Sequence, residues 1–364
     1  MGVVDKIADL EAEYAKTQKN KATEGHLGLL KAKIARLKKE VEEGGKGGKG
    51  GGASHGFDVK KAGNSTVVLI GLPSVGKSSI LNALTGAGSR TAAHAFTTVT
   101  CIPGMLEYRG AQIQILDLPG IIAGAEAGRG RGKEVIAVAR NADLVLFVLD
   151  VFDPFYLSKL RATLESIGIR LDCGPPRISL SRSLKGGVDA VFEKKPTHLT
   201  QKLVTQILGE YGIFSATVIF REDATVDQLI DVLVGSRVYA PSLVVINKVD
   251  LVKADFLKKV PLEFVPLSAE KKYNIEKLKE AIFEKLKLIR VYTRSRFDGT
   301  DKDEPLIVRQ GTSVGAAAEK LHRDLKTLFK AAKIWGPSAK HPGQRVGPDH
   351  LLQDGDTFMI EKKR

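Results

Sequence analysis

Cysteines and long apolar runs are scarce in this sequence of 364 residues. The two cysteines, Cys101 and Cys173, fit neither a metal-binding nor a redox spacing, so both are expected to be reduced thiols. The seven histidines form no ligand cluster, which argues against a zinc site. No run approaches the roughly 18 apolar residues of a membrane span, and the residues after Met1 match neither a signal peptide nor a myristoylation site. These absences predict a cytoplasmic protein without a membrane partner.

Basic residues outnumber acidic ones, with 56 Lys and Arg against 42 Asp and Glu and a net charge of +14. Such an excess is typical of proteins that meet phosphate-rich partners such as RNA, although a lysine-rich solvated surface has the same balance. The segment 319–345 holds seven basic and two acidic residues, with Phe329 and Trp335 among them. The sequence leaves two interpretations open there, RNA contact and a solvated helix face.

A phosphate-binding loop is the most specific motif. Residues 71–78 read Gly-Leu-Pro-Ser-Val-Gly-Lys-Ser, follow an apolar run at 67–70 and lead into a helix-like run. This strand, loop and helix setting is the one in which the motif binds polyphosphate through backbone N–H groups. Lys77 would reach the β- and γ-phosphates, and the Ser78 hydroxyl would bind Mg²⁺. The predicted nucleotide contacts here are Gly71, Pro73, Ser74, Val75, Gly76, Lys77, Ser78 and Ser79.

A second motif concerns the metal and the γ-phosphate. Asp117 ends the apolar run 113–116, where a carboxylate can hold the Mg²⁺ shell. Gly120, which has no Cβ, can turn its N–H toward the γ-phosphate. Between the loop and Asp117, either Thr97 or Thr98 would place its hydroxyl on Mg²⁺ and its N–H on the γ-phosphate. A threonine-rich strand start is the competing interpretation of these two residues.

Two motifs further along the chain identify the base. Asn247, Lys248 and Asp250 follow the apolar run 243–246. The Asp250 carboxylate would accept hydrogen bonds from N1–H and the N2 amine of guanine. Adenine offers neither donor and would leave the carboxylate unpaired, so GTP is expected and ATP rejected. The pair Ser268 and Ala269 follows another such run and would support the base from its other side.

The hydrolysis rate is expected to be slow without help. Many GTPases orient the attacking water with a Gln after the glycine of this motif, but this chain has Ile121. Lys77, Mg²⁺ and backbone N–H groups such as that of Gly120 would stabilise charge, while the nucleophile is poorly placed. The missing help would come from a monovalent cation at the phosphates or from a partner surface.

The N-terminal segment predicts a helical hairpin. Residues 1–43 are charged and helix-forming, and their apolar seam is interrupted at Gly25. The hairpin could pack on itself or on a partner. Residues 44–56 are rich in glycine and predict a flexible linker.

The chain between Asp117 and Asn247 is longer than a G domain needs, which predicts an insertion. Its pattern indicates a small α+β subdomain in which no catalytic motif is recognised. The C-terminal segment predicts a further α+β module with a helix over 314–332. The predicted segments are 57–168 and 241–289 for the G domain, 169–240 for the insertion and 290–364 for the C-terminal module.

Other residues point to one family. They are 17–23 and 26–32 in the hairpin, 73–75, 96–98 and 117–122 around the motifs, 130–132 and 135–140 after them, and 335–336, 345–347 and 349–350 near the end. On these residues the whole sequence resembles the developmentally regulated GTP-binding (DRG) proteins of the Obg family of GTPases. The resemblance implies an α/β P-loop G domain, a helical hairpin, an insertion like ribosomal protein S5 domain 2, and a C-terminal ubiquitin-like TGS domain.

The resemblance also bears on cofactors and partners. It implies that Thr98, rather than Thr97, is the magnesium ligand. It implies association with ribosomes and, in eukaryotes, a zinc-finger regulatory partner, for a protein expected to be a monomer. Related potassium-stimulated GTPases have an Asn where this chain has Ser74, whose one hydroxyl oxygen sits on a shorter arm. Potassium is therefore left open as a second cofactor beside Mg²⁺.

Three functions are compatible with these motifs. The first is a GTPase switch acting on ribosomes, translation or RNA. The second is a nucleotide-gated scaffold for RNA or protein whose hydrolysis is incidental. The third, a metabolic P-loop kinase or ATPase, is disfavoured by Asp250.

Overall fold

Two compact units make up the chain. The computed structural model describes residues 2–18, 20–21, 23–44, 62–85, 102–118, 138–295 and 299–362. One unit joins Met1–Ser54 to Gly168–Tyr239, and the other joins His55–Ile167 to Ala240–Arg364. Each unit therefore combines segments that lie far apart in the sequence. Within the described ranges, no helix is both long and apolar enough to cross a membrane.

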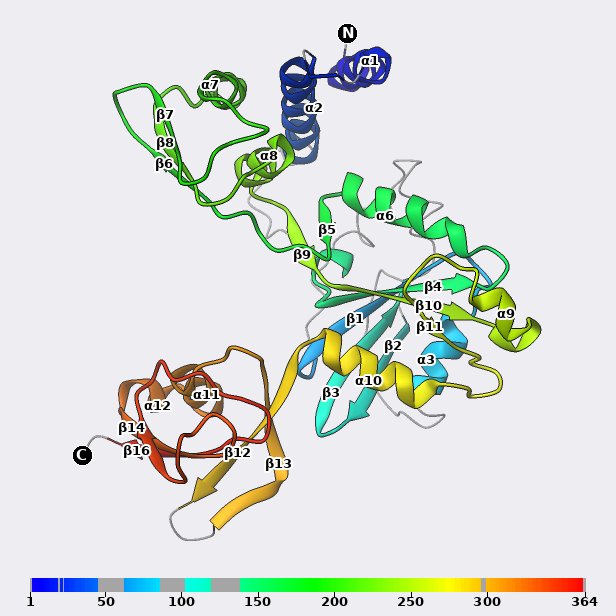
Figure 1. Cartoon of the computed structure of the whole chain (residues 1–364), viewed down its shortest axis with the longest axis vertical. Helices are drawn as coiled ribbons and strands as arrows, with labels where there is room; N and C mark the ends of the chain where they lie inside the picture. The colour runs from blue at the N-terminus through cyan, green and yellow to red at the C-terminus, as the bar shows by residue number, and fades with distance from the viewer. Residues whose placement is uncertain are drawn as a thin grey trace. The chain divides into compact units, whose positions relative to one another are not determined.

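The second unit contains a six-stranded sheet (Figure 1). Its order is β11-β10-β4-β1-β3-β2, and every neighbouring pair is parallel except β2 with β3. The central strands carry the apolar runs 67–70 and 144–149 because both faces of a parallel sheet are buried. The strands are β1 (Ser65–Ile70), β2 (Ile102–Tyr108), β3 (Ala111–Asp117), β4 (Leu144–Asp150), β10 (Ser242–Asn247) and β11 (Val265–Pro266).

Helices cover both faces of this sheet. On one face, α3 (Lys77–Thr85) and α10 (Ile275–Lys285) contribute buried residues to a core shared with β1, β3 and β4. On the other, α6 (Leu157–Ser166) places the Arg161 guanidinium 5.6 Å from the centroid of the Phe147 ring. Short helical segments follow the strands: η1 (Pro154–Tyr156), η2 (Val249–Leu251) and α9 (Ala254–Leu257). The carboxyl ends of the parallel strands meet at one edge, where such sheets bind ligands.

A five-stranded sheet of order β13-β12-β16-β14-β15 forms the rest of the second unit. Its strands are β12 (Leu288–Ser295), β13 (Gly299–Arg309), β14 (Phe329–Trp335), β15 (Gln344–Val346) and β16 (Thr357–Lys362). The predicted helix over 314–332 is wrong in its second half. Helix α11 (Val314–Leu321) is followed by the single turn α12 (Asp324–Thr327), and then β14 begins. Lys and Ala residues favour a helix in isolation, but pairing with β15 and β16 overrides that propensity.

The first unit begins with a helical hairpin of α1 (Val3–Lys16) and α2 (Glu24–Gly44). The predicted break at Gly25 is wrong, because Gly25 belongs to the first turn of α2. The break lies in the turn before α2, where Thr23 N donates to Asn20 Oδ1 (2.9 Å) and Asn20 N donates to Thr23 Oγ1 (3.1 Å). These side chains satisfy backbone groups outside a helix, which is why Asn and Thr favour turns.

The insertion completes this unit. A three-stranded sheet of order β6-β8-β7 is covered by two helices, and a two-stranded ladder of β5 and β9 connects it to the rest of the chain. The hairpin packs here, since Ala32 of α2 is fully buried in the core of the insertion. The elements are β5 (Ile169–Leu171), β6 (Ile178–Arg182), β7 (Val188–Phe192), α7 (Gln201–Glu210), β8 (Ala216–Phe220), α8 (Val226–Val234) and β9 (Val238–Ala240).

Candidate nucleotide-binding site

The phosphate-binding loop lies between β1 and α3, at the carboxyl edge of the parallel sheet. Gly76 has a φ of +94°, and a Cβ there would collide with the amide nitrogen of Asn247, so only glycine fits. Ser74 also adopts a positive φ, of +62°. The loop ends at the N-terminus of α3, whose free N–H groups and dipole favour a phosphate.

Lys77 is the first residue of α3 and is only 8% exposed. Its Nζ donates to the carbonyl oxygens of Gly71 (3.1 Å) and Leu72 (2.9 Å), which holds the ammonium across the loop. Burial lowers the pKa of Lys77, while the nearby Asp117 carboxylate opposes that shift. A poorly hydrated ammonium in this position is well placed to interact with an anionic oxygen.

Asp117 and Ser78 form the candidate magnesium site. Ser78 Oγ donates to Asp117 Oδ2 at 2.7 Å, so the end of β3 and the start of α3 bring both side chains together. The other oxygen, Asp117 Oδ1, is buried and has no hydrogen-bond partner among the residues that the structure describes. A buried carboxylate oxygen left unpaired is costly. Mg²⁺ prefers oxygen ligands such as hydroxyl and carboxylate groups, so the Ser78 and Asp117 side chains fit this metal.

Asn247 connects two parts of the site. Its Nδ2 donates to the Val75 carbonyl in the phosphate-binding loop at 2.9 Å. Its Oδ1 accepts from the backbone N–H of Ala269 at 3.1 Å. The buried amide at the end of β10 therefore joins the phosphate side of the site to the segment predicted to support the base. A cavity of about 770 Å³ is lined by Ser79 of α3 and by Ala269 and Lys272 of that segment, among others.

Asp250 lies in η2, just after β10, with 13% of its side chain exposed. Hydrogen bonding from the Ser268 side chain holds the pKa of Asp250 below its ordinary value, and Lys271 Nζ, 3.6 Å away, acts in the same direction. Ser268 is itself buried and accepts from the Lys271 N–H. An ionised carboxylate in this setting can accept two hydrogen bonds from one ligand edge.

Asp150 is a residue of this edge that the sequence motifs did not indicate. It ends β4 directly opposite Asn247 of β10. Its Oδ2 lies 2.6 Å from Lys248 Nζ, and its Oδ1 accepts from the Phe152 N–H. The ion pair fixes the Lys248 side chain between the carboxyl ends of two adjacent strands. One signal in the sequence could have indicated Asp150: it is an acidic residue at the end of an apolar strand.

Part of the predicted site lies beyond the described ranges. Thr97, Thr98, Gly120 and Ile121 all lie outside the described residues, as does Cys101. The site that the structure describes therefore comprises the phosphate-binding loop, the Asp117 end of β3 and the segments predicted to hold the base.

Comparison with known proteins agrees with this geometry. Models described as "50S ribosome-binding GTPase", "C-terminal region of MMR_HSR1 domain" and "TGS domain" match residues 66–178, 185–288 and 289–361. A developmentally regulated GTP-binding protein 1 homolog of Dictyostelium discoideum is 46% identical over the full length of both chains. Human developmentally regulated GTP-binding protein 2 is likewise 46% identical over both full lengths.

The chain belongs to the developmentally regulated GTP-binding (DRG) protein family. An uncharacterised GTP-binding protein of Methanocaldococcus jannaschii, 47% identical over all of this chain and 94% of its own, extends the likeness to an archaeon. The predicted family and fold class are confirmed: this DRG protein is a GTPase with a P-loop G domain and a C-terminal TGS domain.

Proposed function

We propose that this DRG protein is a GTP-driven switch that acts on ribosomes or RNA. The matched model is described as ribosome-binding, and the chain carries a net charge of +14 that suits phosphate-rich partners. The main support for GTP binding is the pair of hydrogen bonds by which Asn247 joins the phosphate-binding loop to the segment at Ala269 that is predicted to support the base. The proposal includes a cytoplasmic location, a monomer, and a regulatory protein partner.

In this proposal the nucleotide contacts are those predicted from the motifs. The backbone N–H groups of the loop 71–79, except at Pro73, hold the phosphates, and Lys77 contacts the β- and γ-oxygens. Asp250 accepts from the guanine edge while Ser268 and Ala269 support the ring. Mg²⁺, held by the Ser78 hydroxyl, Thr98 and the Asp117 carboxylate, would neutralise charge on the phosphates. Gly120 turns its N–H toward the γ-phosphate.

The source of catalytic help is testable because Ile121 cannot hold a water by hydrogen bonding. GTP turnover by the full chain is compared in potassium and sodium buffers of equal ionic strength. Faster turnover in potassium would assign the help to a cation at the phosphates, with Ser74 as its neighbour in the loop. Equal rates would discard the cation and leave a partner surface as the source.

A nucleotide-gated scaffold is the competing function. Lys77→Ala removes the ammonium and should abolish GTP binding, whereas Thr98→Ala should retain binding and lose hydrolysis. A hydrolysing switch requires both variants to fail in complementing loss of the protein in cells. Full function of Thr98→Ala together with failure of Lys77→Ala would contradict the switch and establish a scaffold driven by binding alone.

A further inference from the structure

One face of the TGS sheet is covered by α11. The opposite face is buried at its Leu288 and Ile307 end, where both side chains belong to the core of the six-stranded sheet, and is open over the rest of β12, β14, β15 and β16. Neighbouring residues on a strand point to opposite faces, so the strand register separates two sets of side chains. The first set packs with α11 and includes Val291, Ala332, Ile334 and Phe358, all buried. The second set lies on the opposite face and is partly or fully exposed: Tyr292, Arg294, Lys333, Trp335, Arg345, Thr357, Met359 and Glu361.

Aromatic residues form one row across this open face. Thr357 of β16 is paired with Tyr292 of β12 on one side and with Trp335 of β14 on the other. The two aromatic residues are therefore two strands apart, about 10 Å at the usual strand spacing. The Arg294 guanidinium lies over the Trp335 ring, 4.7 Å from its centroid. Aromatic rings and guanidinium planes are the groups on which unstacked nucleic acid bases stack.

Cations form the next row of the same face. Lys333 of β14 is paired with Met359 of β16 and with Arg345 of β15. Glu361 lies 3.9 Å from Lys333 Nζ and 3.1 Å from Arg345 Nη2, so one carboxylate holds two cations on the face. Together with Arg294, Lys333 and Arg345 give three cations for the single Glu361 carboxylate in this group of residues. The excess positive charge beside stacking groups is complementary to a chain of phosphates with exposed bases.

We propose that the open face of the TGS sheet binds single-stranded RNA. Tyr292, Trp335 and Arg294 stack on bases, while Lys333 and Arg345 contact phosphates. This assignment rests on the RNA part of the proposed function and locates it on the sheet. The basic residues of the α11–α12 segment, such as Arg323, belong to a different part of the domain.

Trp335 makes the test direct, because it is the only tryptophan of the chain. The full-length protein is titrated with a single-stranded oligouridylate while its tryptophan fluorescence is followed. Stacking predicts a saturable fluorescence change that a matched RNA duplex and polyglutamate do not reproduce. Binding of polyglutamate or duplex RNA as tight as that of the single strand would overturn the proposal, and so would binding without a fluorescence change.

Variants test the two rows separately. Tyr292→Ala should weaken binding roughly tenfold by removing one stacked base. Lys333→Ala and Arg345→Ala should each reduce the slope of log affinity against log salt by about 0.7, the value for one phosphate contact on a single strand. Arg323→Ala, an exposed cation of the same domain, is the matched control. An equal loss in Arg323→Ala and Arg345→Ala would contradict the assigned face.

Measuring GTP hydrolysis and RNA binding together distinguishes failure of RNA binding at this face from failure of the GTPase. GTP hydrolysis is measured on the same preparations, and these variants should hydrolyse GTP at the rate of the unaltered protein. Loss of RNA binding with normal hydrolysis supports the sheet face. Normal hydrolysis without any RNA binding by the unaltered protein would reject the face and leave GTP turnover intact.

Discussion

We propose that Asp250 determines the choice of base. Asp250→Asn replaces one acceptor oxygen by an amide NH₂ group, a donor that would face the N2 amine of guanine, so GTP affinity should fall roughly 10²- to 10³-fold. The same amide should pair with xanthine, which has a carbonyl oxygen in place of that amine. Competition of GTP and XTP against a fluorescent nucleotide measures both effects.

The control for this substitution is Asp255→Asn, since Asp255 is highly exposed on α9. It should leave both affinities unchanged. If Asp250→Asn bound GTP as tightly as the unaltered protein, Asp250 could not be the residue that recognises guanine.

Asp150 should act by positioning Lys248. The two side chains are 2.6 Å apart and partly exposed, so their pairing is worth up to about 1 kcal/mol. Asp150→Asn should therefore speed GDP dissociation up to about fivefold, with the preference for GTP over ATP preserved. Stopped-flow release of a fluorescent GDP measures the rate.

A double-mutant cycle distinguishes positioning from a general structural role. In a Lys248→Met background, Asp150→Asn should have no further effect on release. An effect of equal size in both backgrounds would show that Asp150 acts independently of Lys248.

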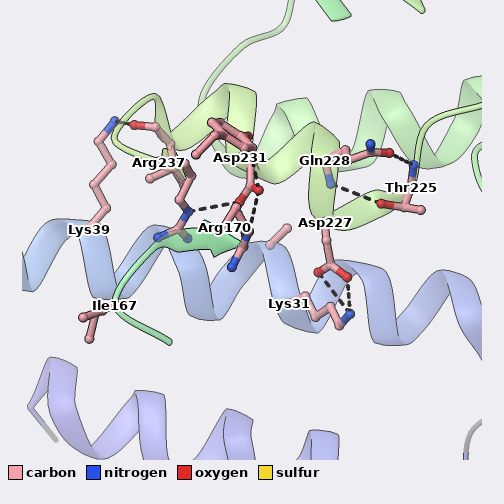
Figure 2. A network of polar contacts seen from close by, with 12 residues as sticks. Lys31, Lys39, Ile167, Arg170, Thr225, Asp227, Gln228, Asp231 and Arg237 are labelled. Carbon is pink, nitrogen blue, oxygen red and sulfur yellow. Dashed lines mark hydrogen bonds and ion pairs between the residues drawn. The ribbon is translucent and has the colours of Figure 1, made fainter. Parts of the chain in front are cut away.

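Among the elements, α8 is tied to the strands that enter and leave the insertion by a buried ion network. Asp231 of α8 accepts from Arg170 Nε and Nη2 at 2.7 Å each, and from Arg237 Nε at 3.0 Å (Figure 2). The Asp231 side chain is 4% exposed. Asp231→Ala leaves two arginines without this partner and should destabilise the first unit by about 3–5 kcal/mol in urea unfolding.

The exposed pair Lys31–Asp227, which joins α2 to α8, provides the control for this experiment (Figure 2). Asp227 is about half exposed, so Asp227→Ala should cost no more than about 1 kcal/mol. Equal losses from Asp231→Ala and Asp227→Ala would mean that burial of the Asp231 network adds nothing to stability.

The contact of α2 with the insertion is also testable. Ala32 is fully buried, and the Tyr211 hydroxyl donates to its carbonyl at 3.4 Å. Ala32→Leu should overpack this core and lower stability by about 1–3 kcal/mol. Thermal unfolding measures the loss, and Ala8→Leu on the exposed side of α1 should change little. Equal melting temperatures for the two variants would contradict the docking of α2.

At the level of the whole molecule, the G domain was predictable because its motifs are local. Each motif comes at or just after the end of a buried apolar strand, so the strand and the functional residue can be predicted from the same short segment. Asp117 and Asn247 are examples. Other features depend on contacts between distant segments. The Asp150–Lys248 pair joins residues 98 positions apart, and burial of Ala32 needs the insertion beside α2. The residues of β14 predict a helix when taken alone, because the strands that pair with them come later in the chain.

Dependence of ribosome binding on the nucleotide is the central claim about this molecule. Its most direct test is co-sedimentation of the full chain with ribosomes, in a non-hydrolysable GTP analogue or in GDP, across a salt series. A GTP-driven switch predicts stronger binding with the analogue, with log affinity falling linearly against log salt as phosphate contacts are lost. Equal binding in both nucleotides at every salt concentration would contradict it.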